Sequence, residues 1–250
     1  MENVAPIGAI TRRTRQLLQL AFVVVAGGVF VTFLGLALYS VPLAVPANSI
    51  YPFYNFMRGM LLFGGAIIAL VGLALAVRLY FVRPDNPLAQ ITGHYLGQYL
   101  DERYWFVRNI NKRGLGYIDA VLVGPPGALV FRIVDDEGDF RNDKGDWLKR
   151  NRQGEWMPAP VNPTHEAIVD IKALREYLAR FNLGNVPVYG VVVFTKDPML
   201  ARIEVKEPVV LVSPLVTLYE TLHQPNQYMG RDDRIDPASI MQVVDLIFDR

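Results

Sequence analysis

The chain lacks cysteine altogether: none of its 250 residues is one. This absence excludes disulfide bonds, thiolate ligands for metals, Cys-x-x-Cys redox motifs and thiol nucleophiles. Histidine is also scarce, and no two of His94, His165 and His223 stand at the spacing of a metal site, so ordinary structural or surface roles are expected for them.

Charge is scarce in the first third of the chain, and its sign is uneven. Residues 1–83 carry six basic residues and one acid, whereas residues 84–250 carry 19 basic and 23 acidic residues, a net charge of −4. The second part thus lacks the excess of Lys and Arg with which proteins bind phosphate backbones. Its charge does not indicate a nucleic-acid-binding protein.

Long apolar runs dominate the first part. No charged residue occurs from Gln16 to Met57, and residues 17–41 are almost continuously apolar, which exceeds the about 20 residues that cross the hydrocarbon core of a bilayer. A second apolar run covers Gly59–Val77, between Arg58 and Arg78, and residues 79–82 can extend it. Two transmembrane helices, about 17–41 and 58–82, are therefore predicted. They form a hairpin in a lipid bilayer over residues 17–83, preceded by a short cytoplasmic segment, 1–16, and separated by a proline-rich loop.

Basic residues around the two runs predict the orientation of the hairpin. The loop has only Arg58, at its inner edge, whereas the outer flanks carry Arg12, Arg13, Arg15, Arg78 and Arg83. Because cytoplasmic flanks carry the excess of Lys and Arg, a multi-pass protein of the cytoplasmic (inner) membrane is expected, with both termini cytoplasmic. The alternative is a cleaved signal peptide with the triplet Val45-Pro46-Ala47, against which the length of the apolar run argues.

Small residues recur on one face of each predicted helix, at the spacing that lets two helix backbones approach closely in lipid. They are Gly28, Thr32 and Gly35 in the first helix and Gly65, Ala69, Gly72 and Ala76 in the second. We expect the two faces to pack on each other; a homo-oligomer formed through them is the alternative. Neither helix has an ionisable residue in its interior, so ion or proton transport is not expected.

Residues 84–250 have the composition of a soluble domain. Apolar spacing predicts a helix from Pro87 to about Arg103, and Asn162-Pro163 opens another, since Asn is a good N-cap and Pro suits the first helical position. Apolar, β-branched runs predict strands at Tyr104–Ile110, Tyr117–Val123, Ala128–Val134, Val186–Thr195 and Val209–Val212, with a small hairpin at Trp147–Met157. Ser213-Pro214 and Asp236-Pro237 are each expected to open a short helix. This order predicts an α/β (α+β) domain with a mixed sheet flanked by helices.

Several of these segments together resemble the NERD (nuclease-related) domain. The most specific piece is Gly116-Tyr117-Ile118-Asp119 followed by four apolar residues and Gly124-Pro125. It is joined by Gly127–Phe131, Trp147, Asn162-Pro163 and Val188–Phe194, and the similarity covers roughly Thr92 to Leu222. The resemblance implies a restriction-endonuclease-like core. In that family an Asp on one strand and a Glu-x-Lys on the next hold a divalent ion and cleave a phosphodiester.

The sequence matches only part of that pattern. Asp119 stands at the family's Asp, but the Glu position, counted from Gly127, falls on Arg132 and the Lys position on Val134. A guanidinium among the ligands repels Mg²⁺, and one carboxylate competes poorly with the ion's own waters. A vestigial site of Asp119, Arg132 and Val134 is therefore predicted, with no catalytic residue, metal or cofactor expected. Glu166, where the family usually has Gln, is a further departure.

The turn between the two strands predicts how the vestigial site is filled. A turn centred on Pro125-Pro126 pairs residues whose numbers sum to about 251, which places Asp119 opposite Arg132 on one face of the sheet. An ion pair between these two side chains is predicted at the place of the family's metal.

Acidic and basic clusters after the second strand leave alternatives open. Asp135 and Asp136, together with Asp119, would be the ligands of a working Mg²⁺-dependent nuclease, although a solvated acidic turn is preferred. The basic residues that would suit nucleic acid or lipid headgroups are interleaved with acids; they are Arg141, Lys144, Lys149, Arg150 and Arg152. The leading prediction is a membrane-anchored, catalytically inactive NERD-like domain for binding or scaffolding, with an unidentified protein or nucleic-acid partner. The alternatives are a nuclease with displaced acidic ligands and a structural membrane protein that binds another protein.

Overall fold

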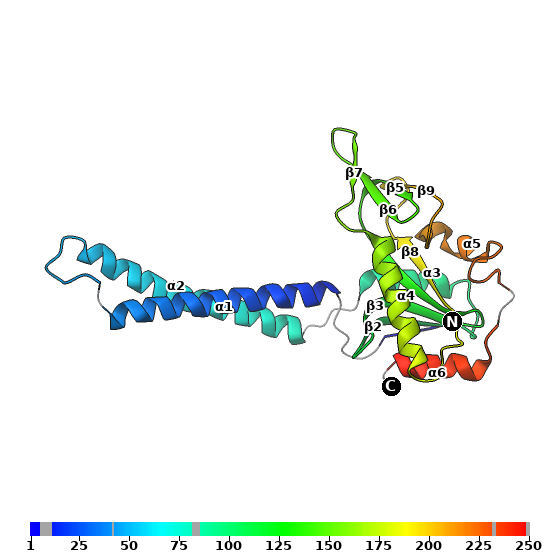
Figure 1. Ribbon diagram of the computed structural model, residues 1–250, viewed down its shortest axis with the longest axis horizontal. Coiled ribbons are helices and arrows are strands. Elements are labelled where there is room, and N and C mark those ends of the chain that lie inside the picture. Colours follow the sequence, from blue (N-terminus) through cyan, green and yellow to red (C-terminus); the bar gives the residue numbers. More distant parts are fainter. Residues whose placement is uncertain (6–11, 42, 82–85, 232–233, 249–250) are drawn as a thin grey trace. The chain divides into compact units, whose positions relative to one another are not determined.

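The computed structural model describes residues 1–5, 12–41, 43–81, 86–231 and 234–248. It consists of two compact units, residues 10–84 and residues 1–9 with 85–250 (Figure 1). The orientation predicted above depends on groups outside this description, namely Arg83 and the side chains of Arg12, Arg13 and Arg15.

The first unit is a pair of antiparallel helices, α1 (Arg12–Ser40) and α2 (Tyr51–Phe81) (Figure 1). Both are long and apolar enough to cross a membrane, over Gln16–Ser40 and Tyr51–Leu79, and their apolar side chains are mostly exposed. Helix α2 begins earlier than the expected residue 58, and Pro52 does not break it. Proline is tolerated there because the first turn of a helix has no internal partner for its N–H groups.

The two helices contact each other through their small residues. A Cβ added to Gly28 would lie 2.4 Å from the backbone nitrogen of Ala69, and one added to Gly65 would lie 2.5 Å from that of Thr32. Any larger side chain at these positions would push the backbones apart. The sequence analysis gave two alternatives for these small-residue faces, packing within the hairpin and contacts between copies. In the structure, the two faces pack on each other within the hairpin.

Arg58, placed by the sequence at the edge of the loop, lies inside α2. Its guanidinium carbon is 4.1 Å from the ring centroid of Tyr39 on α1, and the rings of Tyr51 and Tyr54 also surround it. The Tyr54 hydroxyl donates a 2.5 Å hydrogen bond to the carbonyl oxygen of Leu38 at the end of α1. These contacts close the turn between the helices.

The second unit contains two sheets. The main sheet has the order β1-β2-β3-β4-β8-β10; its central strands β2, β3 and β4 are antiparallel, and the pairs β1–β2, β4–β8 and β8–β10 are parallel. Its strands are β1 (Glu2–Val4), β2 (Trp105–Lys112), β3 (Gly116–Gly124), β4 (Gly127–Val134), β8 (Val188–Phe194) and β10 (Leu211–Pro214). The smaller sheet has the order β7-β6-β5-β9. Its strands are β5 (Gly138–Asp143), β6 (Asp146–Arg150), β7 (Trp156–Pro158) and β9 (Ala201–Lys206).

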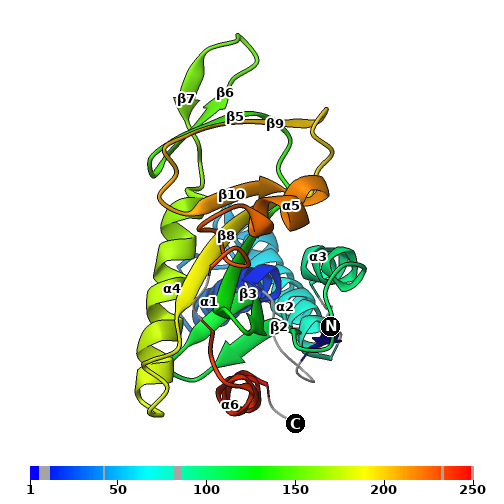
Figure 2. The same cartoon turned by 90° about the vertical axis from the view of Figure 1, so that its right-hand side faces the viewer.

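Helices cover both faces of the main sheet (Figure 2). Helices α4 (Pro163–Ala179) and α6 (Pro237–Ile247) pack on the face that carries Val121 and Val130. Helices α3 (Pro87–Gly97) and α5 (Leu218–His223), the latter preceded by the 3₁₀ turn η1 (Leu215–Thr217), pack on the face that carries Leu122 and Phe131. The alternation of apolar side chains along each strand therefore fills two cores, as expected for a sheet buried on both sides.

The structure confirms the predicted mixed sheet flanked by helices and corrects several details. Asn162 caps α4 as predicted, because its Oδ1 accepts from the backbone N–H of His165 at 2.9 Å. A short helical segment, η1 and α5, follows Ser213-Pro214 as predicted, but Ser213 does not cap it: both residues end β10, and Pro214 is the N-cap position without a side-chain hydrogen bond. The helix predicted to reach Arg103 ends at Gly97. Strands β1, β5 and β9 were not predicted; all three pair in parallel with strands distant in sequence.

Candidate functional site

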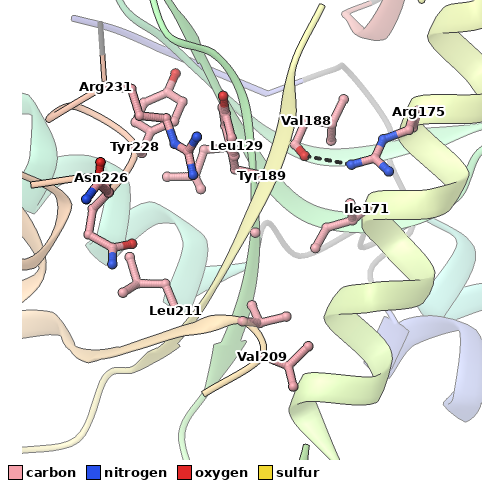
Figure 3. A pocket seen from close by; sticks show the side chains of 13 residues that line it. Leu129, Ile171, Arg175, Val188, Tyr189, Val209, Leu211, Asn226, Tyr228 and Arg231 are labelled. Atoms are coloured by element: carbon pink, nitrogen blue, oxygen red, sulfur yellow. Dashed lines mark hydrogen bonds between the residues drawn. The ribbon is translucent and has the colours of Figure 1, made fainter. Parts of the chain in front are cut away.

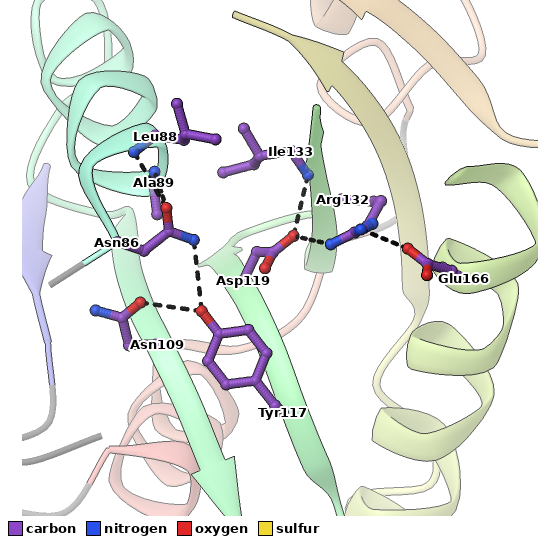
Figure 4. Close-up of polar contacts among 9 residues, drawn as sticks. All are labelled: Asn86, Leu88, Ala89, Asn109, Tyr117, Asp119, Arg132, Ile133 and Glu166. Atoms are coloured by element: carbon purple, nitrogen blue, oxygen red, sulfur yellow. Dashed lines mark hydrogen bonds and ion pairs between the residues drawn. The ribbon is translucent and has the colours of Figure 1, made fainter. Parts of the chain in front are cut away.

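The candidate site forms where β3 and β4 leave their shared turn. The pairs Ala120↔Phe131 and Val121↔Val130 have numbers that sum to 251, as the turn predicted. Asp119 therefore stands opposite Arg132, and Arg132 Nη1 lies 2.9 Å from Asp119 Oδ2 (Figure 4). The predicted ion pair is confirmed. It is well buried, since the side chains of Arg132 and Asp119 are 16% and 5% exposed.

Helix α4 supplies two further acids to Arg132. Its first turn carries Glu166, whose Oε2 lies 2.5 Å from Arg132 Nη2. Asp170 is one turn further along and is buried, whereas the Glu166 side chain is 33% exposed; at this spacing the two carboxylates share a helix face. Burial by itself lowers the pKa of the Arg132 guanidinium, but attraction by Asp119, Glu166 and Asp170 outweighs it and raises that pKa. Arg132 is therefore a permanent cation among three acids.

Asp119 is also tied to the backbone and lies beside a polar network. Its Oδ2 accepts a 3.1 Å hydrogen bond from the N–H of Ile133. On the other side of β3, Asn109 of β2 has a left-handed backbone conformation, with φ of 56°. It interrupts the pairing of β2 with β3. The Tyr117 hydroxyl donates to Asn109 Oδ1 at 3.2 Å and accepts from Asn86 Nδ2 at 3.4 Å, which links the strands to the start of α3 (Figure 4). The carboxylate of Asp119 is itself held by the Ile133 N–H and by Arg132.

The remaining predicted site residues do not join Asp119. Val134 packs on the core of the smaller sheet, among the side chains around Phe140 and Trp147, and supplies no charge. Asp135 Oδ1 accepts a 2.7 Å hydrogen bond from the Thr195 hydroxyl, and its other oxygen lies 3.6 Å from Lys196 Nζ. Asp136 is exposed. The acids after β4 thus form the solvated turn that the sequence favoured.

The basic cluster on the smaller sheet is partly neutralised by acids of the same sheet. Arg141 pairs with Glu204 at 2.8 Å, and Arg150 lies 3.5 Å from Asp139. Arg141 also stacks on the ring of Trp156, at 4.4 Å. This arrangement fits a solvated surface better than a phosphate-binding patch.

A divalent ion of the kind that the fold implies does not fit the residues around Asp119. Among the residues that the structure describes, no three His, Asp or Glu side chains are placed to hold a metal ion together. The guanidinium of Arg132 lies against the carboxylate oxygen that a metal would need, and like charges at such a distance repel strongly in a buried site. Val134, at the position where the resemblance predicts the family's Lys, has no group that could orient an attacking water.

The sequence analysis did not predict that α4 contributes two acids to the surroundings of Arg132. Glu166 was noted only as a departure, and Asp170 was not noticed. The sequence pattern did indicate a buried acid on α4. Asp170, four residues after Glu166, lies on the same helical face as the buried Ala167 and Leu174, where a carboxylate without a partner would be costly.

The mixed sheet, its flanking helices and the paired side chains on two adjacent central strands define a restriction-endonuclease-like domain. Within that class, residues 85–195 match the family model NERD, the Nuclease-related domain, so the chain carries a domain of this family. The match starts before the expected Thr92, ends before Leu222, and includes Asp119, Arg132 and Glu166. Neither a curated protein nor a solved structure matches the chain.

Proposed function

We propose that this protein is a membrane-anchored NERD-domain protein that has lost phosphodiesterase chemistry and keeps the domain as a binding or scaffolding module. The observation that supports this proposal is the bridge of Arg132 between Asp119 and Glu166. One buried cation lies beside Asp119, the predicted metal ligand, and pairs with both acids. The domain then needs no metal to hold its carboxylates together.

A cleavage assay tests the loss of activity. The full chain, purified in detergent, is incubated with DNA and Mg²⁺ or Mn²⁺ beside an Asp119→Asn variant and an Asp101→Asn control. We expect the unaltered chain and both variants to give the same background level of cleavage, because Arg132 repels the ion. Cleavage that Asp119→Asn abolishes and Asp101→Asn keeps, in a variant that retains native tryptophan fluorescence, would support the nuclease with displaced acidic ligands instead.

The partner is then sought on membranes. Affinity capture of the chain from solubilised membranes, with and without nuclease treatment, separates two kinds of partner. A partner retained after treatment is a protein, whereas one lost with the treatment depends on nucleic acid. The first result is expected, because the domain's net charge does not favour phosphate binding.

We also propose that α1 and α2 both cross the inner membrane and that both termini are cytoplasmic. Support comes from β1, which precedes α1 in the chain yet pairs with β2, which follows α2. In addition, the Met1 nitrogen donates to the carbonyl oxygen of Leu100 at 3.1 Å. Because β1 and β2 belong to one sheet, the segments before α1 and after α2 lie on the same side of any membrane. Either both helices cross the membrane or neither does. Cleavage after Ala47 would remove β1 from the sheet.

Cysteine labelling tests this topology, and the chain's lack of cysteine makes single-cysteine variants unambiguous. Ser49→Cys in the loop is expected to react with a membrane-impermeant maleimide in intact cells. Glu2→Cys and Gln153→Cys, also at exposed positions, are expected to react only after the membrane is permeabilised. Labelling of Gln153→Cys in intact cells would contradict the proposed side.

A further inference from the structure

A pocket of about 250 Å³ lies at the edge of the main sheet, on the far side of β4 from β3 (Figure 3). Strand β10 pairs with β8 only from Val191 onward, opposite Leu211. The first three residues of β8 therefore line the pocket, together with α4 and residues 209–211 and 226–231. The last two segments lie outside the range that matches the NERD family.

Arg231 forms one polar wall of the pocket. Its guanidinium carbon lies 4.6 Å from the centroid of the Tyr189 ring, and its Nε is buried with no hydrogen-bond partner in the described part of the chain. Stacking on an aromatic face leaves the edge of a guanidinium available for hydrogen bonds in its own plane. Such an unsatisfied donor is costly unless a ligand accepts from it.

The segment that carries Arg231 is fixed to the sheet. Tyr228 is 2% exposed, and its hydroxyl donates a 2.8 Å hydrogen bond to the carbonyl oxygen of Gly127. Its ring meets the Tyr189 ring edge to face, with centroids 5.8 Å apart. Burial raises the pKa of Tyr228 well above its ordinary value, so the hydroxyl stays a donor. The wall is thus held in place before any ligand arrives, which reduces the entropic cost of binding.

Arg175 of α4 adds a second positive charge across β8. Its Nη2 donates to the carbonyl oxygen of Val188 at 3.1 Å, which holds the guanidinium at the strand's edge (Figure 3). The other polar side chains of the lining are the amides of Asn226 and Gln227 and the phenols of Tyr189 and Tyr228, and no carboxylate lines the pocket among the described residues. Two arginines without an acid favour an anion, since guanidinium groups bind carboxylate and phosphate oxygens.

The rest of the lining is apolar, and the pocket is small. Aliphatic side chains form one part of it, namely Leu129, Ile171, Val188, Val209, Val210 and Leu211. Its volume of about 250 Å³ is below the about 300–1,000 Å³ of pockets for drug-sized ligands. A small molecule with an apolar body fits these properties, whereas a nucleic-acid strand or a folded partner does not.

We propose that this pocket binds a small organic anion, a phosphate or carboxylate group on an apolar or aromatic body. Arg231 binds the anionic group, Arg175 adds positive charge from the other side of β8, and the aliphatic side chains contact the body (Figure 3). This site is separate from Asp119 and Arg132, so it gives the domain a ligand that requires no metal.

Calorimetry on the full chain in detergent tests the proposal, with phenyl phosphate, benzoate and the neutral benzamide as probes. At least one anion is expected to bind, and benzamide about tenfold or more weakly. Arg231→Gln is expected to weaken anion binding by about tenfold or more, since a hydrogen bond to a charged group is lost. Arg175→Gln should weaken it also. Arg202→Gln removes an exposed arginine of β9 and should change nothing.

Two results would overturn the proposal. One is that neither anion binds the unaltered chain at millimolar concentration. This result is expected if Asp232 and Asp233, which follow Arg231 outside the described residues, neutralise the charge of Arg231. The other is binding that Arg231→Gln, with its native tryptophan fluorescence, leaves unchanged. Neither result depends on cleavage activity, so the proposed loss of phosphodiesterase chemistry is tested separately.

Discussion

An Arg132→Met variant is expected to lose about 3–5 kcal/mol of the free energy of unfolding of the soluble domain. Arg132 pairs with Asp119 and Glu166, and its guanidinium is also attracted by Asp170. Methionine has a similar volume but no charge. The substitution therefore leaves buried carboxylates that repel one another, with no cation to offset their lost hydration.

Denaturant unfolding followed by tryptophan fluorescence measures this loss without interference from α1 and α2, which contain no tryptophan. All three tryptophans, Trp105, Trp147 and Trp156, belong to the soluble domain. Arg103→Met is the matched control, because its pair with Asp101 is exposed and should leave the unfolding midpoint unchanged. Adding Asp119→Asn and Glu166→Gln to Arg132→Met should restore part of the stability. An Arg132→Met variant as stable as the unaltered chain would contradict the assigned role of this cation.

Gly28→Leu is expected to separate the two helices α1 and α2. A Cβ at Gly28 already meets backbone atoms of Ala69, and backbone cannot rotate away as a side chain can. We expect the interaxial distance to rise towards the about 8–10 Å of helices that pack through larger side chains. The cost is about 1–3 kcal/mol of hairpin stability, the usual effect of overpacking. Gly65→Leu should act in the same way, because its Cβ would meet the backbone of Thr32.

Neighbouring glycines provide matched controls. A Cβ on Gly27 or Gly64 meets nothing within 4 Å, so Gly27→Leu and Gly64→Leu should leave the hairpin unchanged. The separation is measured in nanodiscs between spin labels on Leu20→Cys and Val77→Cys, in a chain without other cysteines. Should Gly28→Leu keep the label distance and instead dissociate an oligomer, the small-residue faces would serve contacts between copies.

Prediction from sequence worked where neighbouring residues decide the outcome. The two apolar runs, the caps at Asn162 and Asp236 and the turn at Pro125-Pro126 are local signals, and each agrees with the structure. The pairing of Asp119 with Arg132 followed from the same turn, because a tight turn leaves a single register for the strands that it joins. The helix end near Arg103 was wrong because apolar spacing alone does not show where the chain turns to start β2.

The remaining contacts of the site depend on segments far apart in the chain. Glu166 and Asp170 reach Arg132 only because α4 packs on the face of the sheet that Asp119 occupies. The wall of the anion pocket likewise joins residues around 190, 210 and 230 at one sheet edge. Parallel pairs such as β1–β2 and β5–β9 have no connecting turn that would mark them in the sequence.

Local sequence patterns were sufficient to predict two apolar segments before a mixed α/β domain, and the resemblance to the NERD family predicted a cation, Arg132, at the position of a metal-binding acid. The tertiary structure decided what surrounds that cation, where the N-terminal strand pairs, and that two arginines share a pocket. The physical reason is that turns, caps and hydrophobic periods act between neighbours, whereas burial, charge neutralisation and strand addition depend on which distant segments pack together.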